Sequence, residues 1–253
     1  LYSIDDILKG QTFYDDSLPV ALQQALDYAG GDGIVATMPE LIAAKVKADS
    51  SHEFWQRWYA PHTEENIGID KEGKWYGVNV PLLVIVNGGG ILTPDRIKEA
   101  YNEGLIDHSA KYKEEEFADL LKGKLPNGMS IDLFPFEEIK NGVSELPHRF
   151  GIVMPYSMAQ NTRSTYVGKE EFLENPLAIA RNAGLQNLEE YFEAAKDTSD
   201  DTLGCYHPFK DRDPTQPQGR VLFLSDYYDG LDGNYNLNNN GRFLGVASET
   251  PSK

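Results

Sequence analysis

Apolar residues in the first third of the chain recur at helical spacing between recognisable helix boundaries. Segment 18–29 follows a capping Ser17 and precedes Gly30. Thr37 and Glu40 form a capping box, in which each side chain binds the other's backbone N–H, and this predicts a helix that runs to about residue 48. A similar Ser and Glu pair precedes segment 54–59. The pattern therefore predicts a helical N-terminal third.

The pattern changes after residue 66. Segments 67–69 and 74–78 flank a short polar turn and predict a hairpin, and 82–86 is an unbroken apolar run typical of a strand covered on both faces. Further predicted strands are 130–134, 150–154, 220–224 and 242–246, and further predicted helices are 94–103, 113–122, 136–140, 169–174, 176–182 and 187–196. This alternation favours a mixed α/β or α+β fold with a central mixed sheet flanked by helices.

The chain has 253 residues, which one globular domain can accommodate. We therefore expect a single domain over 1–253, with 125–130 and 198–204 as the alternative places for a boundary. Residues 248–253 are small and polar and predict a flexible tail.

Charge limits the classes of partner. The net charge is −17, and the 23 basic residues are scattered along the chain. Such a surface repels phosphate backbones and anionic lipid, which argues against nucleic-acid binding. No apolar run approaches the roughly 20 residues of a membrane helix, so we expect no membrane insertion. A protein partner remains compatible with an acidic surface.

Cysteine usage bears on the compartment. Cys205 is the single cysteine, so it cannot form an internal disulfide. This favours a cytoplasmic location, with export followed by signal removal as the alternative. The chain begins at Leu1 rather than Met, which suggests that an upstream segment was removed.

The sharpest local motif is a glycine-rich turn after the buried strand. Asn87, Gly88, Gly89 and Gly90 lead into a helix capped by Thr93. Glycine-rich backbone at a helix start can turn its N–H groups toward an anion, so these five residues are a candidate ligand site. The segment also resembles the strand-then-HGGG element of α/β-hydrolase esterases, which implies an oxyanion hole. Asn87 stands where that family has His, and the chain has no G-x-S-x-G nucleophile elbow. A plain strand-to-helix turn is the third interpretation.

The loop 226–241 is rich in Asp, Asn, Gly and Tyr. Calcium prefers six to eight oxygen ligands on flexible backbone. The candidate metal ligands are Asp229, Asp232, Asn234, Asn236, Asn238 and Asn240. Asn and Gly are also common in ordinary loops, so a structured surface or binding loop is the alternative.

Two functional hypotheses follow. The first, slightly favoured, is a non-enzymatic binding or assembly module that contacts a protein partner through its acidic surface and loop 226–241, with calcium as a candidate cofactor. The second is an enzyme that acts on a small anionic metabolite held at 87–90. In that case His148 or His207 would supply acid–base chemistry. The sequence contains no clear pair of nucleophile and base.

Overall fold

The computed structural model describes residues 2–143, 145–197, 199–226 and 230–248. The central feature is a six-stranded mixed sheet with the order β5-β10-β3-β4-β7-β6. Its strands are β3 (Thr63–Asp70), β4 (Val80–Asn87), β5 (Ala110–Lys111), β6 (Asp132–Pro135), β7 (Phe150–Pro155) and β10 (Gln218–Val221). Among these described strands only β6 and β7 pair in parallel. The predicted central mixed sheet is confirmed.

Two smaller sheets flank it. One has the order β1-β13-β2 and the other β11-β12-β9-β8. Their strands are β1 (Gln11–Asp15), β2 (Ile34–Val35), β8 (Thr165–Gly168), β9 (Thr202–Tyr206), β11 (Phe223–Leu224), β12 (Leu231–Asp232) and β13 (Gly241–Val246). β1 and β13 pair along their length, which brings the beginning and the end of the described chain together.

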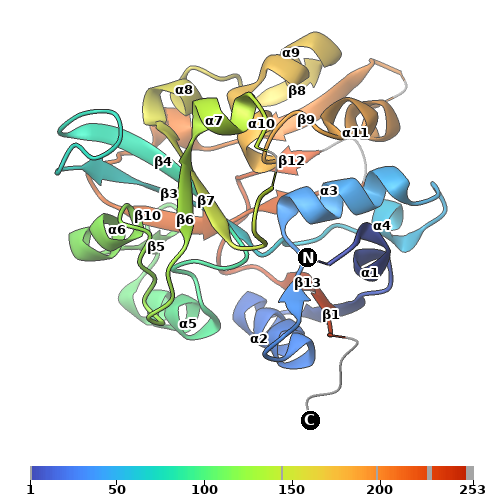
Figure 1. The fold of residues 1–253 in the computed structure, drawn as a ribbon, viewed down its shortest axis with the longest axis horizontal. Helices are drawn as coiled ribbons and strands as arrows, with labels where there is room; N and C mark the ends of the chain where they lie inside the picture. Colours follow the sequence, from blue (N-terminus) through green and yellow to red (C-terminus); the bar gives the residue numbers. More distant parts are fainter. Residues whose placement is uncertain (1, 144, 198, 227–229, 249–253) are drawn as a thin grey trace.

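Helices surround the sheets. The predicted helical N-terminal third is confirmed by α1 (Ile4–Leu8), α2 (Leu18–Ala29), α3 (Met38–Lys47) and α4 (Glu53–Gln56). The later helices are α5 (Pro94–Glu103), α6 (Glu114–Leu120), α7 (Phe136–Lys140), α8 (Tyr156–Gln160), α9 (Lys169–Glu174), α10 (Pro176–Arg181), α11 (Leu188–Ala195) and the 3-10 turn η1 (Phe209–Asp211). In Figure 1, α7 to α11 gather at the top of the view and α2 and α5 at the bottom, with the six-stranded sheet between them.

Strand β4 separates two hydrophobic cores. Leu83 and Ile85 point into one cluster, and Leu82, Val84 and Val86 point into the other. Alternate residues of a strand face opposite sides of the sheet. Because a core covers each side, all five side chains are at most 1% exposed. Burying each such side chain contributes roughly 1.5–3 kcal/mol. The expectation of a strand covered on both faces is confirmed.

Local boundary signals were read correctly at several helices. Thr37 and Glu40 form the capping box of α3, and Thr93 accepts a hydrogen bond from the backbone N–H of Arg96 in α5. Gly30 and Gly104 end α2 and α5 with φ of 68° and 88°, a region that favours glycine. No helix in the described residues is long and apolar enough to cross a bilayer.

Three element predictions were wrong in detail. The strand that pairs with β3 is β4, and the segment 74–78 lies in the long turn between them. The predicted strand 220–224 is divided between β10 and β11, which belong to different sheets. Helix α4 ends at Gln56, so Trp58 does not lie on it.

Candidate functional site

The Asn-rich loop leaves β12, returns through β13 and is described from Gly230 onward. Its main chain is held by segments outside the loop, through hydrogen bonds from Gly233 N to Tyr206 O (2.9 Å), Leu237 N to His108 O (3.0 Å) and Leu18 N to Asn239 O (3.1 Å). The side chain of Leu237 is 1% exposed and anchors the loop in the core. The loop is therefore a fixed structure and not a loose connection.

Two buried arginines support the loop from beneath. Arg181 donates from Nη1 to the carbonyl of Leu231 at 3.1 Å, and Arg220 donates from Nη1 to the carbonyl of Gly233 at 2.7 Å. Arg181 also forms an ion pair with Glu65 on β3, with Nε 2.8 Å from Oε1 and both side chains 0% exposed. A buried guanidinium needs such partners because desolvation of an unpaired charge is costly. The central sheet thus fixes the loop through these arginines.

Gly233 is required by this arrangement. A Cβ at this position would lie 2.4 Å from Nη2 of Arg181 and 2.7 Å from Oε2 of Glu65, closer than real contacts allow. The glycine lets the loop backbone pass directly over the buried ion pair. Its role is close approach and not conformational freedom.

The loop's asparagine side chains face outward. Asn234 and Asn238 are exposed, and Asn236 and Asn239 are half-buried. Among the described residues none of these four side chains takes part in a hydrogen bond. Asn238 borders an open hollow of about 550 Å³ that Tyr101 and His108 also line. The side chains are therefore available to a ligand, whereas main-chain groups of Gly233, Leu237 and Asn239 are held by other segments.

An aromatic cluster lies beside the loop. Trp58 packs against Phe223, with ring centroids 5.2 Å apart, and against Tyr235 at 5.7 Å. Phe223 and Tyr235 stack at 4.8 Å. Tyr14 on β1 meets the edge of Trp58 at 6.4 Å and is 47% exposed. We call these four aromatic side chains and Arg242 the aromatic platform. They come from β1, β11, β13, the loop and the segment after α4.

Arg242 provides the platform's positive charge. Its guanidinium carbon lies 4.7 Å from the ring centroid of Trp58 and 5.0 Å from that of Tyr14. Within the described residues it forms no ion pair, and its Nε has no hydrogen-bond partner. Trp, Tyr and Arg are the residues that most often dominate binding energy at interfaces, since they combine large apolar area with polar groups. The platform can therefore bury an apolar group and receive an acidic one.

Lys45 lies beneath the start of the loop. Its Nζ donates to the carbonyls of Ser225 and, at 3.3 Å, of Asp226, and it lies 5.0 Å from the ring centroid of Trp55. Burial lowers the pKa of this lysine to about 7, an effect that the negative charge of Asp226 partly opposes. Lys45 is 1% exposed, so its charge is poorly solvated when it is protonated.

This lysine predicts a pH dependence of stability. Between pH 7 and pH 10.5 the unfolded chain keeps the Lys45 proton and the folded chain releases it. The free energy of unfolding therefore gains up to about 1.4 kcal/mol per pH unit as pH rises through this window. We expect Lys45→Met to lack this gain in urea unfolding at pH 7.5, 8.5 and 9.5. The exposed Lys47→Met is the control and should parallel the unmodified chain. Parallel profiles for all three proteins would contradict the prediction.

The glycine-rich turn already surrounds a carboxyl group of the protein itself, that of Glu64. The carboxylate of Glu64 accepts hydrogen bonds from the backbone N–H of Ile91 at 2.8 Å and of Leu92 at 2.9 Å. The N–H of Gly88 donates to the carbonyl of His62 at 2.9 Å. Burial raises the pKa of Glu64, and these hydrogen bonds oppose that shift. The N–H groups of Gly88, Ile91 and Leu92 are thus already bonded within the protein.

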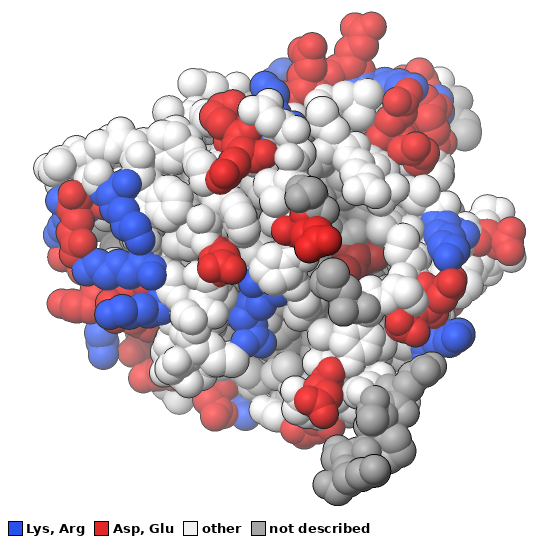
Figure 2. Space-filling model, in the orientation of Figure 1, with Lys and Arg blue, Asp and Glu red and all other residues white. Residues whose placement is uncertain are grey.

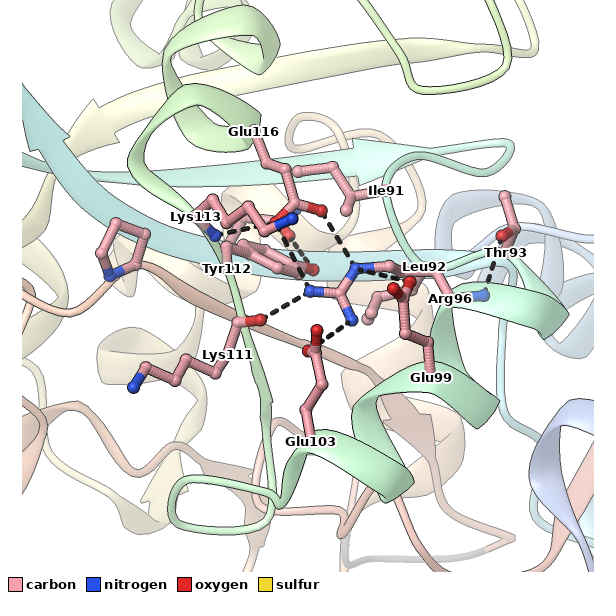
Figure 3. Close-up of polar contacts among 12 residues, drawn as sticks. Ile91, Leu92, Thr93, Arg96, Glu99, Glu103, Lys111, Tyr112, Lys113 and Glu116 are labelled. Carbon is pink, nitrogen blue, oxygen red and sulfur yellow. Dashed lines mark hydrogen bonds and ion pairs between the residues drawn. The ribbon is translucent and has the colours of Figure 1, made fainter.

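The remaining predicted ligand residues have structural partners. Asn87 is buried and accepts a hydrogen bond from the Thr63 hydroxyl, and its Nδ2 has no partner in the described residues. Thr93 caps α5. Figure 3 shows how this helix is fastened: Arg96 extends from α5 to Glu116 on α6, to Glu103 and to the carbonyl of Lys111. The anion site remains a prediction.

The two candidate histidines lie in different surroundings. The ring of His148 pairs with Glu40 at 2.8 Å, and the backbone of His148 packs against Gly88. His207 lies at the end of β9, where its Nε2 is 2.9 Å from the carbonyl of Thr162. Burial lowers the pKa of His207, an effect that Arg181 reinforces. The structure brings His148, but not His207, beside the glycine-rich turn.

The calcium ligands remain a prediction as well. Asp229 lies outside the described residues. Within them, Asp232 accepts a hydrogen bond from the N–H of Asn234, and Asn240 bonds to Tyr235 and to Tyr14. The described residues contain no group of three or more His, Cys, Asp and Glu side chains that could hold a metal ion. The donor set therefore consists mainly of neutral amides, which are weak calcium ligands.

Sequence reasoning missed the platform. It placed Trp55 and Trp58 together in the predicted helical segment 54–59. Trp55 is buried, but Trp58 is half-exposed. Nothing local indicates that Trp58 meets Phe223 and Tyr235, because these contacts join distant parts of the chain.

Comparison with known proteins gives one informative match. No protein-family model and no curated protein sequence matches the chain. A solved structure described as "Accommodation of massive sequence variation in Nanoarchaeota by the C-type lectin fold" aligns with a TM-score of 0.71 and 26% identity, over 94% of this chain and 97% of the other. The chain therefore shares the mixed helix-and-strand architecture of a C-type lectin fold, a fold used by binding modules.

Proposed function

We propose that this chain is a binding module that contacts a protein partner through the exposed side chains of loop 232–241 and the aromatic platform. The loop supplies hydrogen-bonding amides, and the platform supplies apolar area and the charge of Arg242. The acidic remainder of the surface would disfavour partners of the same charge. Catalysis is not required of any residue in this proposal.

The observation that carries the proposal is that the backbone of the loop is bound to the rest of the protein and its asparagine side chains are not. Backbone groups of Leu231, Gly233 and Leu237 are bound by residues outside the loop, and the side chains of the four asparagines are unbonded in the described structure. Side chains that make no stabilising contacts can be substituted without changing the backbone conformation of the loop. Such a loop suits recognition, because specificity can vary while the scaffold stays constant.

The comparison supports this proposal. The aligned structure is described in terms of massive sequence variation accommodated by its fold. We extend that property to this chain and propose that positions 234, 236, 238 and 239 tolerate substitution.

A substitution series tests the scaffold. Single changes of Asn234, Asn236, Asn238 and Asn239 to Ser or Tyr should change the free energy of unfolding by no more than about 0.5 kcal/mol, since these side chains bear no contacts that hold the fold. Leu237→Ala, in the same loop but buried, should cost about 2–5 kcal/mol. Urea unfolding measures both. Comparable losses of unfolding free energy in the asparagine variants and in Leu237→Ala would contradict the proposal that the asparagine side chains do not stabilise the fold.

A display experiment tests the binding surface. A library randomised at the four asparagine positions is selected against lysozyme as an arbitrary protein probe. We expect binders, and we expect Trp58→Ala in a selected binder to weaken affinity at least about tenfold, because the platform would form the centre of the contact. Trp75→Ala, which removes a tryptophan bonded to Leu121, should leave affinity unchanged. If no binder emerges, or if Trp58→Ala has no effect, the proposal fails.

A further inference from the structure

A pocket of about 220 Å³ lies between helix α6 and the turn that joins β3 to β4. Its floor is apolar and is formed by Ile69, Phe117, Ala118, Leu121 and Pro217. A cavity of roughly 150 Å³ lined by apolar side chains accommodates benzene, so this pocket has room for a somewhat larger aromatic group. Its lining residues are not part of the loop or of the aromatic platform.

Three of the four acidic side chains that line this pocket have partners within the protein. The buried carboxylate of Asp70 accepts hydrogen bonds from the backbone N–H of Gly73 at 2.8 Å and of Trp75 at 3.0 Å. Two ion pairs join the turn to α6 and the residues just after it, Lys71 with Glu114 at 2.5 Å and Glu72 with Lys122 at 2.6 Å. In Figure 2, basic side chains gather with acidic ones at the left of the molecule, where this hairpin and α6 lie in Figure 1.

Lys74 is the basic residue of the pocket lining that takes part in neither of these ion pairs. Its Nζ donates to the carbonyl of Leu121 at 3.2 Å and lies 5.5 Å from the ring centroid of Trp75. Within the described residues Lys74 forms no ion pair. Asp70, and Glu115 in the first turn of α6, are the lining carboxylates outside these ion pairs. An ammonium that is held over apolar surface and lacks a carboxylate partner attracts an anionic group on a ligand.

We propose that this pocket binds a small aromatic carboxylate. The ring system would lie on the floor formed by Ile69, Phe117 and Leu121, and the carboxylate would pair with Lys74. Apolar area supplies the affinity and the single charge sets the orientation, as is usual in small-molecule sites. This site is independent of the proposed function of the loop.

Calorimetric titration of the full chain with 2-naphthoate tests the proposal, with the uncharged 2-naphthamide as the matched probe. We expect a Kd on the order of 0.1 mM for 2-naphthoate and about tenfold weaker binding of the amide. Lys74→Gln should bring the carboxylate to the level of the amide, because only the charge interaction is lost. Equal affinity of the two probes for the unmodified chain would overturn the assignment of a carboxylate.

A second variant tests the location. Ala118→Trp places an indole in the pocket and should abolish binding of both probes. Gln24→Trp adds the same side chain at an exposed position of α2 and should leave binding unchanged. Persistent binding to Ala118→Trp, or no heat with either probe at about 1 mM, would overturn the proposal. Lys74 is exposed, so Lys74→Gln remains informative even if Ala118→Trp unfolds the chain.

Discussion

Replacing Glu65 by Gln is expected to lower the free energy of unfolding by about 3–5 kcal/mol, because it leaves the buried charge of Arg181 without a counterion. The two side chains meet through two contacts, Nε to Oε1 at 2.8 Å and Nη2 to Oε2 at 3.3 Å. Neither side chain is exposed, so water cannot replace the lost carboxylate. Urea unfolding followed by circular dichroism measures the loss.

Two controls separate the buried pair from charge effects in general. Glu114→Gln removes the partner of Lys71 in an exposed pair and should cost no more than about 1 kcal/mol. The double variant Glu65→Met with Arg181→Met should be more stable than either single variant, since it removes both buried charges. A loss in Glu65→Gln no larger than in Glu114→Gln would show that the buried pair does not hold the fold as inferred.

The same substitution should loosen the loop. Arg181 also donates to the carbonyls of Leu231 and Tyr206, so a displaced guanidinium would release the backbone at β12. Hydrogen exchange at residues 231–233 should then be faster in Glu65→Gln, and exchange in α3 should change only as much as global stability does.

Gly233→Ala is expected to destabilise the chain by about 1–3 kcal/mol through overpacking alone. The added methyl group would lie 2.4 Å from Nη2 of Arg181, and this guanidinium cannot retreat without weakening its pair with Glu65. Thermal unfolding and urea unfolding should agree on the loss. Gly31→Ala is the matched control, since a methyl group added there would have nothing within 4 Å, and its effect should stay within about 0.5 kcal/mol.

Combining the two substitutions provides a further check. Gly233→Ala and Glu65→Gln disturb the same guanidinium, so their joint effect should be smaller than the sum of the single effects. Additive losses would mean that the methyl group is accommodated without moving Arg181.

The sequence by itself determined the parts of this protein that depend on neighbouring residues. The capping box of Thr37 and Glu40, the cap at Thr93 and the buried run at 82–86 all involve groups a few positions apart. Their chemistry is the same in any tertiary context, so the fold class and the structured loop could be predicted. The binding interpretation of the loop rested on its composition in the same way.

The tertiary structure alone decided which distant groups meet. Glu65 and Arg181 are 116 positions apart, and Tyr101 donates to the carbonyl of Leu237 across 136 positions. Glu64 supplies the hydrogen-bond acceptor for a turn that the sequence suggested as a site for an external anion. Periodicity and capping report only on nearby residues, whereas desolvation makes each buried charge depend on whichever partner the sheet places beside it. For that reason the loop could be predicted from its amino-acid composition, whereas the contacts of Arg181 and Arg220 with its backbone could not be predicted.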